Sequence, residues 1–120
     1  MILCFMPDIC LVTSKVTREF LKEVASERYG DMVKVVVDIE KKVMAIGGEM
    51  HADEEQFLLT QGSKQQNLWG INLYPEMAES DFIEFDSMIN IRPKHGNRSR
   101  GVEEVGIREK IIEVVKLFIE

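Results

Sequence analysis

Residues 32–48 read MVKVVVDIEKKVMAIGG, and their pattern is the strongest indication of the fold in this sequence. The odd-numbered positions of 33–39 are all β-branched, and Val36 between them is apolar as well. Apolar side chains on both sides of a strand are typical of a strand in the middle of a sheet. The polar residues 40–42 make a short connection into a second apolar run. We therefore predict a β-hairpin whose first strand is central.

Two elements are expected before this hairpin and one helix directly after it. A short apolar run at 9–13 predicts an edge strand, and Thr17 is placed to cap a helix that Gly30 ends. After the hairpin, Asp53 as N-cap and Gln56 three residues later resemble a capping box. A second, short helix is therefore predicted to begin at Asp53.

The remainder of the chain predicts two more strands and a helix. Residues 68–74 alternate in hydrophobicity, with Asn72 and Tyr74 on the side opposite the core. Residues 82–92 alternate as well: Ile83, Phe85, Ile89 and Ile91 share the core side with Ser87, which marks a break, and Glu84 lies on the opposite side. An apolar stripe from Ile107 to Phe118 predicts a C-terminal helix. The expected fold class is α+β, with a largely antiparallel sheet in β-α-β-β-α-β-β-α order and helices mainly on one face. We expect one domain at 9–120, with residues 1–8 as an N-terminal extension.

Composition limits the classes of function. The chain has 120 residues, 45% of them hydrophobic and 30% charged, which is typical of one globular domain. Its net charge of −6 argues against general nucleic-acid binding, which usually requires a basic excess. No apolar run reaches the length of a membrane span, so no membrane contact is expected. Cys4 and Cys10 lack metal or redox spacing; we expect reduced thiols and a cytoplasmic location.

Three segments resemble a known family when taken together. They are DMVKVVVDIEKKVMAIGGEMHADEE, LWGINLYPE and DFIEFDSMINIRP..GNRSRGVE. In combination they are similar to a small prokaryotic family classed only as a domain of unknown function, over residues 9–118. The resemblance implies no activity, substrate or catalytic residue. It also implies that residues 1–8 precede the usual family start.

One candidate site consists of acidic residues and a histidine. Glu49 and His51 share a side if the backbone is extended there, and Glu84 and Asp86 stand about 7 Å apart on the predicted strand. Imidazole and carboxylate groups are ligands for divalent metals, so a metal is possible, although no cofactor is expected. The alternatives are a helix start at residues 53–55 and an ordinary solvated sheet face.

A second candidate site is the basic loop at 94–101, KHGNRSRG. Positive charge gathers here in an acidic protein, and glycines permit backbone N–H groups to converge on an anion. The candidate ligand-binding residues are Arg92, Lys94, His95, Asn97, Arg98, Ser99 and Arg100. The alternatives are a solvated loop and internal ion pairs with Glu84, Asp86 or Glu103.

Two hypotheses about function follow. The first is a noncatalytic ligand- or partner-binding module, possibly a homodimer, in which the loop at 94–101 binds a small anionic ligand. The alternative is a small metal-dependent hydrolase or phosphoryl-handling enzyme that uses Glu49, His51, Glu84 and Asp86. A side chain of His51 that projects toward Glu84 or Asp86 would favour the enzyme. Burial of Arg92 and Arg98 against the same acids would favour an internal ion-pair network.

Overall fold

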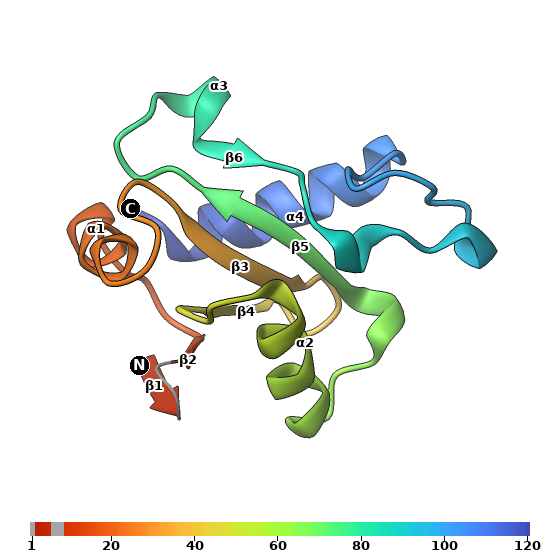
Figure 1. Ribbon diagram of the computed structural model, residues 1–120, viewed down its shortest axis with the longest axis horizontal. Coiled ribbons are helices and arrows are strands. Elements are labelled where there is room, and N and C mark those ends of the chain that lie inside the picture. Colours follow the sequence, from red (N-terminus) through yellow and green to blue (C-terminus); the bar gives the residue numbers. More distant parts are fainter. Residues whose placement is uncertain (1, 6–8) are drawn as a thin grey trace.

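The computed structural model describes residues 2–5, as backbone, and 9–120. A six-stranded antiparallel sheet, in the order β1-β2-β4-β3-β5-β6, runs through the molecule (Figure 1). The strands are β1 (Ile2–Phe5), β2 (Ile9–Val12), β3 (Val33–Asp38), β4 (Val43–Ile46), β5 (Leu68–Leu73) and β6 (Ile83–Glu84). The helices are α1 (Arg18–Ser26), α2 (His51–Thr60), α3 (Glu79–Phe82) and α4 (Val105–Phe118), with 3-10 turns η1 (Gln65–Asn67), η2 (Met88–Asn90) and η3 (Pro93–His95). The predicted α+β class is confirmed.

The hairpin of β3 and β4 lies at the centre of the sheet, as predicted. Strand β3 pairs with β4 on one side and β5 on the other. Asp38 closes the hairpin because its Oδ1 accepts hydrogen bonds of 2.9 Å from the backbone N–H groups of both Glu40 and Lys41. The hydroxyl of Ser63 donates to the other carboxylate oxygen at 2.6 Å. Asp38 therefore has a structural role.

Helices cover both faces of the sheet. Helices α1 and α4 lie on one face, and α2 lies on the other (Figure 1). The larger core packs residues such as Leu21 and Ile111 against β3 and β5, whereas the smaller core joins Leu58 of α2 to Val36 and Leu68. Two of the three longer helices share a face, and the start of α2 lies near Asn72 of β5 on the other face.

Two predictions about this half of the chain are wrong: the edge position of the strand at 9–13 and the start of the second helix at Asp53. Strand β2 is not an edge strand, because β1 pairs with it on the outside. Helix α1 is capped as predicted, since Thr17 Oγ1 accepts from Phe20 N at 3.0 Å. Helix α2, however, begins at His51 with Met50 as its N-cap, and Asp53 lies inside the first turn. His51 is therefore on a helix rather than on extended backbone.

The predicted strand at 82–92 forms only over Ile83–Glu84. Beyond that point the side chain of Asn90 replaces a strand partner of Gly70. Asn90 Oδ1 accepts from Gly70 N at 2.8 Å, and its Nδ2 donates to Gly70 O at 2.9 Å. Ser87 packs so closely on Gly70 that an added Cβ would lie 2.5 Å from Ser87 Cβ. The strand therefore ends at Glu84, three residues before the break that was expected at Ser87.

Because the strand ends early, the apolar residues between 83 and 91 do not share one face of the sheet. Ile83 and Phe85 pack on the core beneath α1 and α4, whereas Ile89 packs on the core beneath α2. Ile91 is 37% exposed. The common core face predicted for all four residues is therefore wrong for the last two.

Cys10 differs from its prediction. It is buried and disulfide-bonded, so the expected reduced thiol is wrong at this position. The Cys4 side chain lies outside the described residues. Disulfides persist mainly in oxidising compartments, so the cysteines do not support the cytoplasmic location predicted from them. None of the described helices has the length and apolar character to cross a bilayer.

Candidate functional site

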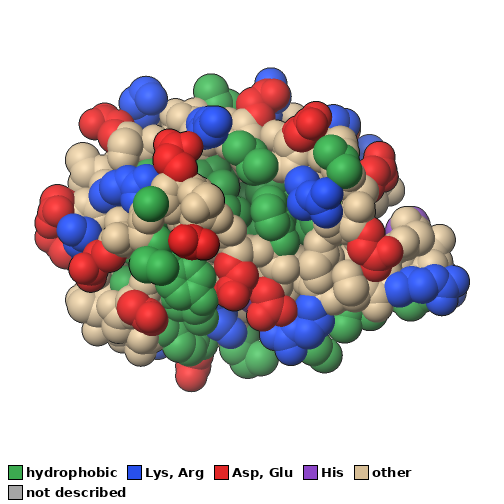
Figure 2. All heavy atoms as spheres, turned by 90° about the horizontal axis from the view of Figure 1, so that it is seen from above, with side chains coloured by type: hydrophobic (Ala, Val, Ile, Leu, Met, Phe, Trp, Pro, Cys, Tyr) green, Lys and Arg blue, Asp and Glu red, His purple; other side chains and the backbone are tan. Residues whose placement is uncertain are grey.

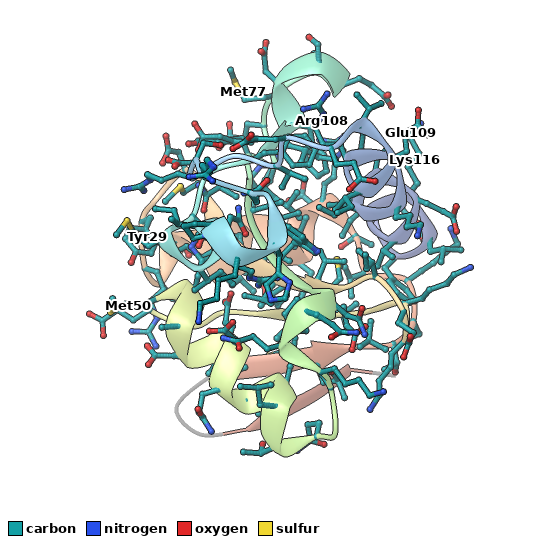
Figure 3. The ribbon with its side chains drawn as sticks, turned by 90° about the vertical axis from the view of Figure 1, so that its right-hand side faces the viewer. Tyr29, Met50, Met77, Arg108, Glu109 and Lys116 are labelled. Carbon is teal, nitrogen blue, oxygen red and sulfur yellow. The ribbon has the colours of Figure 1, made fainter. Side chains whose placement is uncertain are left out.

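A polar pocket of about 360 Å³ opens where α2 begins, beside β5 and β6. We call it the His51 pocket. Figure 3 shows Met50 at the start of α2 with Tyr29 beside it, on the side of the molecule away from Arg108, Glu109 and Lys116 of α4. The pocket is lined by Met32, Lys34, Met50, His51, Ala52, Asn72, Tyr74, Glu84, Asp86, Ser87, Met88, Ile89 and Arg100.

His51 forms part of the inner wall. It is 7% exposed, and its Nε2 lies 2.7 Å from the carbonyl oxygen of Ile71. A carbonyl only accepts, so Nε2 carries the hydrogen. Burial lowers the pKa of His51, which favours the neutral ring. Its other ring nitrogen, Nδ1, is then a hydrogen-bond acceptor, which no described side chain satisfies.

Asn72 forms the centre of the pocket wall. Its Nδ2 donates to Glu84 Oε1 at 2.9 Å and to the Asp86 carbonyl at 3.4 Å. Both neighbours are acceptors, so the orientation of the amide is fixed by chemistry. The Oδ1 atom is buried and has no hydrogen-bond partner among the described residues. A buried acceptor without a partner costs free energy that a ligand or water donor would recover.

Tyr74 and Glu84 form a hydrogen-bonded pair at the rim. The Tyr74 hydroxyl donates to Glu84 Oε1 at 2.9 Å. Partial burial, followed by this bond and the charge of Glu84, raises the pKa of Tyr74 to about 12. The hydroxyl therefore stays protonated at neutral pH, which makes it a binding group rather than an activated nucleophile.

Asp86 and Arg100 close the pocket on another side. Arg100 Nε lies 2.6 Å from Asp86 Oδ1, and both side chains are partly exposed. Such a pair contributes little to stability because solvent screens it. It does neutralise Asp86, and it brings one residue of the predicted basic loop to the pocket. This part of the internal ion-pair alternative is therefore observed.

The predicted metal ligands come together only in part. His51, Glu84 and Asp86 line the same pocket, whereas Glu49 is exposed and does not. No three His, Cys, Asp or Glu side chains among the described residues are placed to hold a metal ion. The Ser87 hydroxyl accepts from Ile89 N at 3.2 Å and so caps η2.

The basic loop has the anion-binding geometry that the sequence suggested, but an internal carboxylate fills it. Glu103 Oε2 accepts from Arg98 N at 2.7 Å and from Ser99 N at 2.9 Å. These backbone bonds, the Arg98 bond foremost, and a bond from the Ser99 hydroxyl lower the pKa of Glu103. The side chain of Glu103 thus occupies the place predicted for an external anion.

Asn97 and Arg92 are tied to the fold in a similar way. Asn97 is 4% exposed, and its Nδ2 donates to the carbonyls of Asn90 at 2.7 Å and Gly101 at 2.8 Å. The guanidinium of Arg92 lies 4.6 Å from the centre of the Trp69 ring. It also donates to backbone carbonyls of Leu68 and Ile89. The exposed side chains on this loop are Lys94, His95, Arg98, Ser99 and Arg100.

We predict that Glu103→Gln loosens the loop. Because the pKa of Glu103 is lowered, its carboxylate stabilises the loop at pH values above the usual carboxyl pKa. This stabilisation is lost as the pH falls through the folded-state pKa of Glu103. Hydrogen exchange of the Arg98 and Ser99 amides should become several-fold faster in the variant at pH 7. Glu104→Gln, which removes the same charge one residue later, should leave both rates unchanged. Equal exchange in the two variants would contradict this role.

Lys34 and Ser87 are among the pocket residues that the sequence analysis did not assign to a site. Lys34 interrupts the apolar run of β3, and it lies opposite Asn72 in the paired strands. Its polar position in MVKVVVDI was the available signal. Ser87 was expected as a break on the core side of the run, but its contact with Gly70, which places it in the pocket wall, has no signature in the sequence.

A second cavity lies elsewhere. An apolar groove of about 520 Å³ runs between the segment of α3 and β6 and helix α4. Figure 2 shows hydrophobic side chains gathered in the middle of the upper face, with charged side chains around them. Residues of the groove include Phe82, Ile83, Phe85, Ile112 and Val115.

Comparison with known proteins places the chain in a family. No curated protein and no solved structure gives a significant match. A family model described as "Protein of unknown function (DUF5674)" matches residues 10–118, which cover nearly the whole α+β domain. The resemblance seen in the sequence is therefore confirmed, and the chain belongs to the DUF5674 family of proteins of unknown function.

Proposed function

We propose that the protein is a noncatalytic binding module whose ligand is a small polar molecule held in the His51 pocket. The observation that carries the proposal is the buried Oδ1 of Asn72, an acceptor without a partner among the described residues, in the wall of a pocket. Neutral His51 supplies a second acceptor. A pocket of about 360 Å³ lies in the usual size range for small ligands.

Two observations favour binding over catalysis. Tyr74, with its raised pKa, is not activated, and Asp86 is paired with Arg100. The proposal also moves the ligand away from the loop at 94–101. The backbone N–H groups of Arg98 and Ser99 already bind Glu103, so the contribution of that loop to the ligand is Arg100.

A variant that fills the pocket tests the proposal. Ala52 is exposed on the first turn of α2 and lines the pocket, so Ala52→Trp adds bulk there without entering a core. We expect some members of a probe set to raise the melting temperature of the wild type, because a ligand of the native state stabilises it. The set contains amino acids, short amines, short carboxylates, nucleosides and inorganic phosphate. Ala52→Trp should abolish these shifts.

Ala52→Ser is the matched control, since it changes the same position with almost no added volume. It should keep every shift. The proposal fails if no probe stabilises the wild type, or if the same probes stabilise Ala52→Trp equally well.

Self-association into a homodimer is a separate part of the proposal, and the cytoplasmic location predicted from the sequence has its own test. The apolar groove beside α4 supports self-association, because contiguous apolar surface often marks an interface. Sedimentation equilibrium measures it directly: a dimer is expected, and a monomer at all concentrations would contradict it. Cell fractionation tests the location, against which the disulfide at Cys10 argues.

A further inference from the structure

We infer that the ligand of the His51 pocket is a small zwitterion of the α-amino acid class, with its ammonium group toward Glu84 and its carboxylate toward Lys34. This inference rests on the proposed function and adds the chemical class of the ligand.

The first argument is the register of three strands. Lys34 of β3 pairs with Asn72 of β5, and Asn72 pairs with Glu84 of β6. The three residues therefore form a row across the sheet, and all three line the pocket. Neighbouring strands lie about 4.8 Å apart, so the backbones of Lys34 and Glu84 are separated by about 10 Å. A positive and a negative side chain thus stand at opposite ends of one polar row.

The second argument is the balance of charge. Asp86 and Arg100 neutralise each other at 2.6 Å. Glu84 receives hydrogen bonds from the neutral groups of Tyr74 and Asn72. Lys34 has no carboxylate within ion-pair distance among the described residues, and its ammonium lies 5.0 Å from the centre of the Tyr29 ring. The pocket therefore keeps one uncompensated charge of each sign, which matches a net-neutral ligand with two separated charges.

The third argument is the distribution of acceptors and donors. Asn72 Oδ1 is a buried acceptor that lacks a partner in the described part of the chain. His51 Nε2 donates to Ile71 O at 2.7 Å, so the Nδ1 of its neutral ring is a second acceptor. Together with Glu84 they suit the three hydrogens of a primary ammonium group. Lys34, His51 and Ala52 line the same pocket, and the backbone N–H groups of His51 and Ala52 have no acceptor within α2. These donors suit a carboxylate.

The methionine residues at the rim of the pocket indicate which side chain the bound amino acid carries. Met32, Met50 and Met88 line it, and Met50 and Met88 are 57% and 64% exposed. Methionine side chains adapt to apolar groups of varied shape. We therefore expect an unbranched apolar side chain to bind better than a charged one.

Calorimetric titration with three matched probes tests the inference. Norleucine carries both charges, pentylamine carries only the ammonium group, and hexanoate carries only the carboxylate. At pH 7 we expect norleucine to bind the wild type at least about tenfold more tightly than either analogue, a difference of about 1.4 kcal/mol. Lys34→Met should reduce norleucine to the affinity of pentylamine, and Glu84→Gln should reduce it to that of hexanoate.

Lys64→Met removes an exposed lysine outside the pocket and should leave all three affinities unchanged. The inference is overturned if either analogue binds as tightly as norleucine, or if norleucine does not bind. If norleucine fails this test but other probes of the larger set bind the wild type and not Ala52→Trp, the zwitterion inference has failed and the proposed function stands. When no probe binds, the proposed function has failed with it.

Discussion

Gly70→Ala should lower the free energy of unfolding by about 3 kcal/mol, at the upper end of the usual cost of overpacking a core. A Cβ at this position would lie 2.5 Å from Ser87 Cβ, 2.6 Å from Ser87 Oγ and 3.2 Å from His51 Cδ2. The first two contacts are closer than non-bonded atoms approach in proteins, so the surrounding structure must move.

The neighbours have little freedom to move. Ser87 is held by its backbone N–H, which donates to Arg100 O at 2.9 Å. Gly70 is held in turn by Asn90, whose amide bonds both its N–H and its carbonyl at 2.8 and 2.9 Å. Displacing either segment breaks buried hydrogen bonds, and unsatisfied buried groups cost about 1–3 kcal/mol each.

Urea unfolding of Gly70→Ala measures the loss. The double variant Gly70→Ala, Ser87→Gly removes the obstructing side chain and should recover part of the stability, as coupled neighbours do. Gly106→Ala is the matched control, because its added Cβ meets only Glu104 Oε1 at 3.7 Å. In helix α4 it should be neutral or stabilising by up to about 1 kcal/mol. Equal stability of Gly70→Ala and the wild type would show that Ser87 does not pack on Gly70 as described.

Glu54→Gln should stabilise the protein, increasingly so above pH 5. Glu54 is fully buried in α2, and its Oε2 accepts from Gly48 N at 2.9 Å. Its other oxygen has no partner among the described residues. Burial raises the pKa of Glu54 well above the usual carboxyl value, an effect that the Gly48 bond opposes only in part.

The direction of the pH dependence follows from this raised pKa. The folded state keeps the proton on Glu54 where the unfolded state releases it, so the wild type is most stable below the unfolded-state pKa. Its stability should fall by about 1.4 kcal/mol per pH unit from there until the folded-state pKa is reached. A glutamine cannot ionise. The advantage of the variant should therefore be small at pH 4 and grow through the range above it.

Urea unfolding at several pH values between 4 and 8 measures this difference. Glu40→Gln removes one negative charge at an exposed position and controls for the change in net charge. A gap between Glu54→Gln and the wild type that stays constant across the series, after this control, would contradict a raised pKa at Glu54.

The sequence predicted the elements whose signal is local. The β-branched run of β3, the cap at Thr17 and the stripe of α4 each act within a few residues, and all three are confirmed. The segment after Glu84 could not be predicted because its path depends on a distant residue. The side chain of Asn90 pairs with Gly70, twenty positions earlier, and no periodicity in hydrophobicity records that contact.

In the candidate site too, some features follow from local sequence patterns and others depend on distant residues. Alternation correctly grouped Asn72, Tyr74 and Glu84 on one side of the sheet. His51 lies beside them for a different reason: α2 starts at His51 and places its ring against Ile71. The basic loop was predicted as an anion site from its composition, and it does bind a carboxylate. That carboxylate belongs to Glu103, which composition could not distinguish from an external ligand.

Amide chemical-shift mapping can show whether a ligand binds beside His51 or at the basic loop. The measurement follows the backbone amide signals during titration with norleucine and, separately, with inorganic phosphate. We expect saturable shifts at His51, Ala52, Asn72 and Glu84 with norleucine, and unchanged signals over 94–99 with either probe. Saturable shifts confined to 94–99, with the pocket amides unmoved, would contradict it.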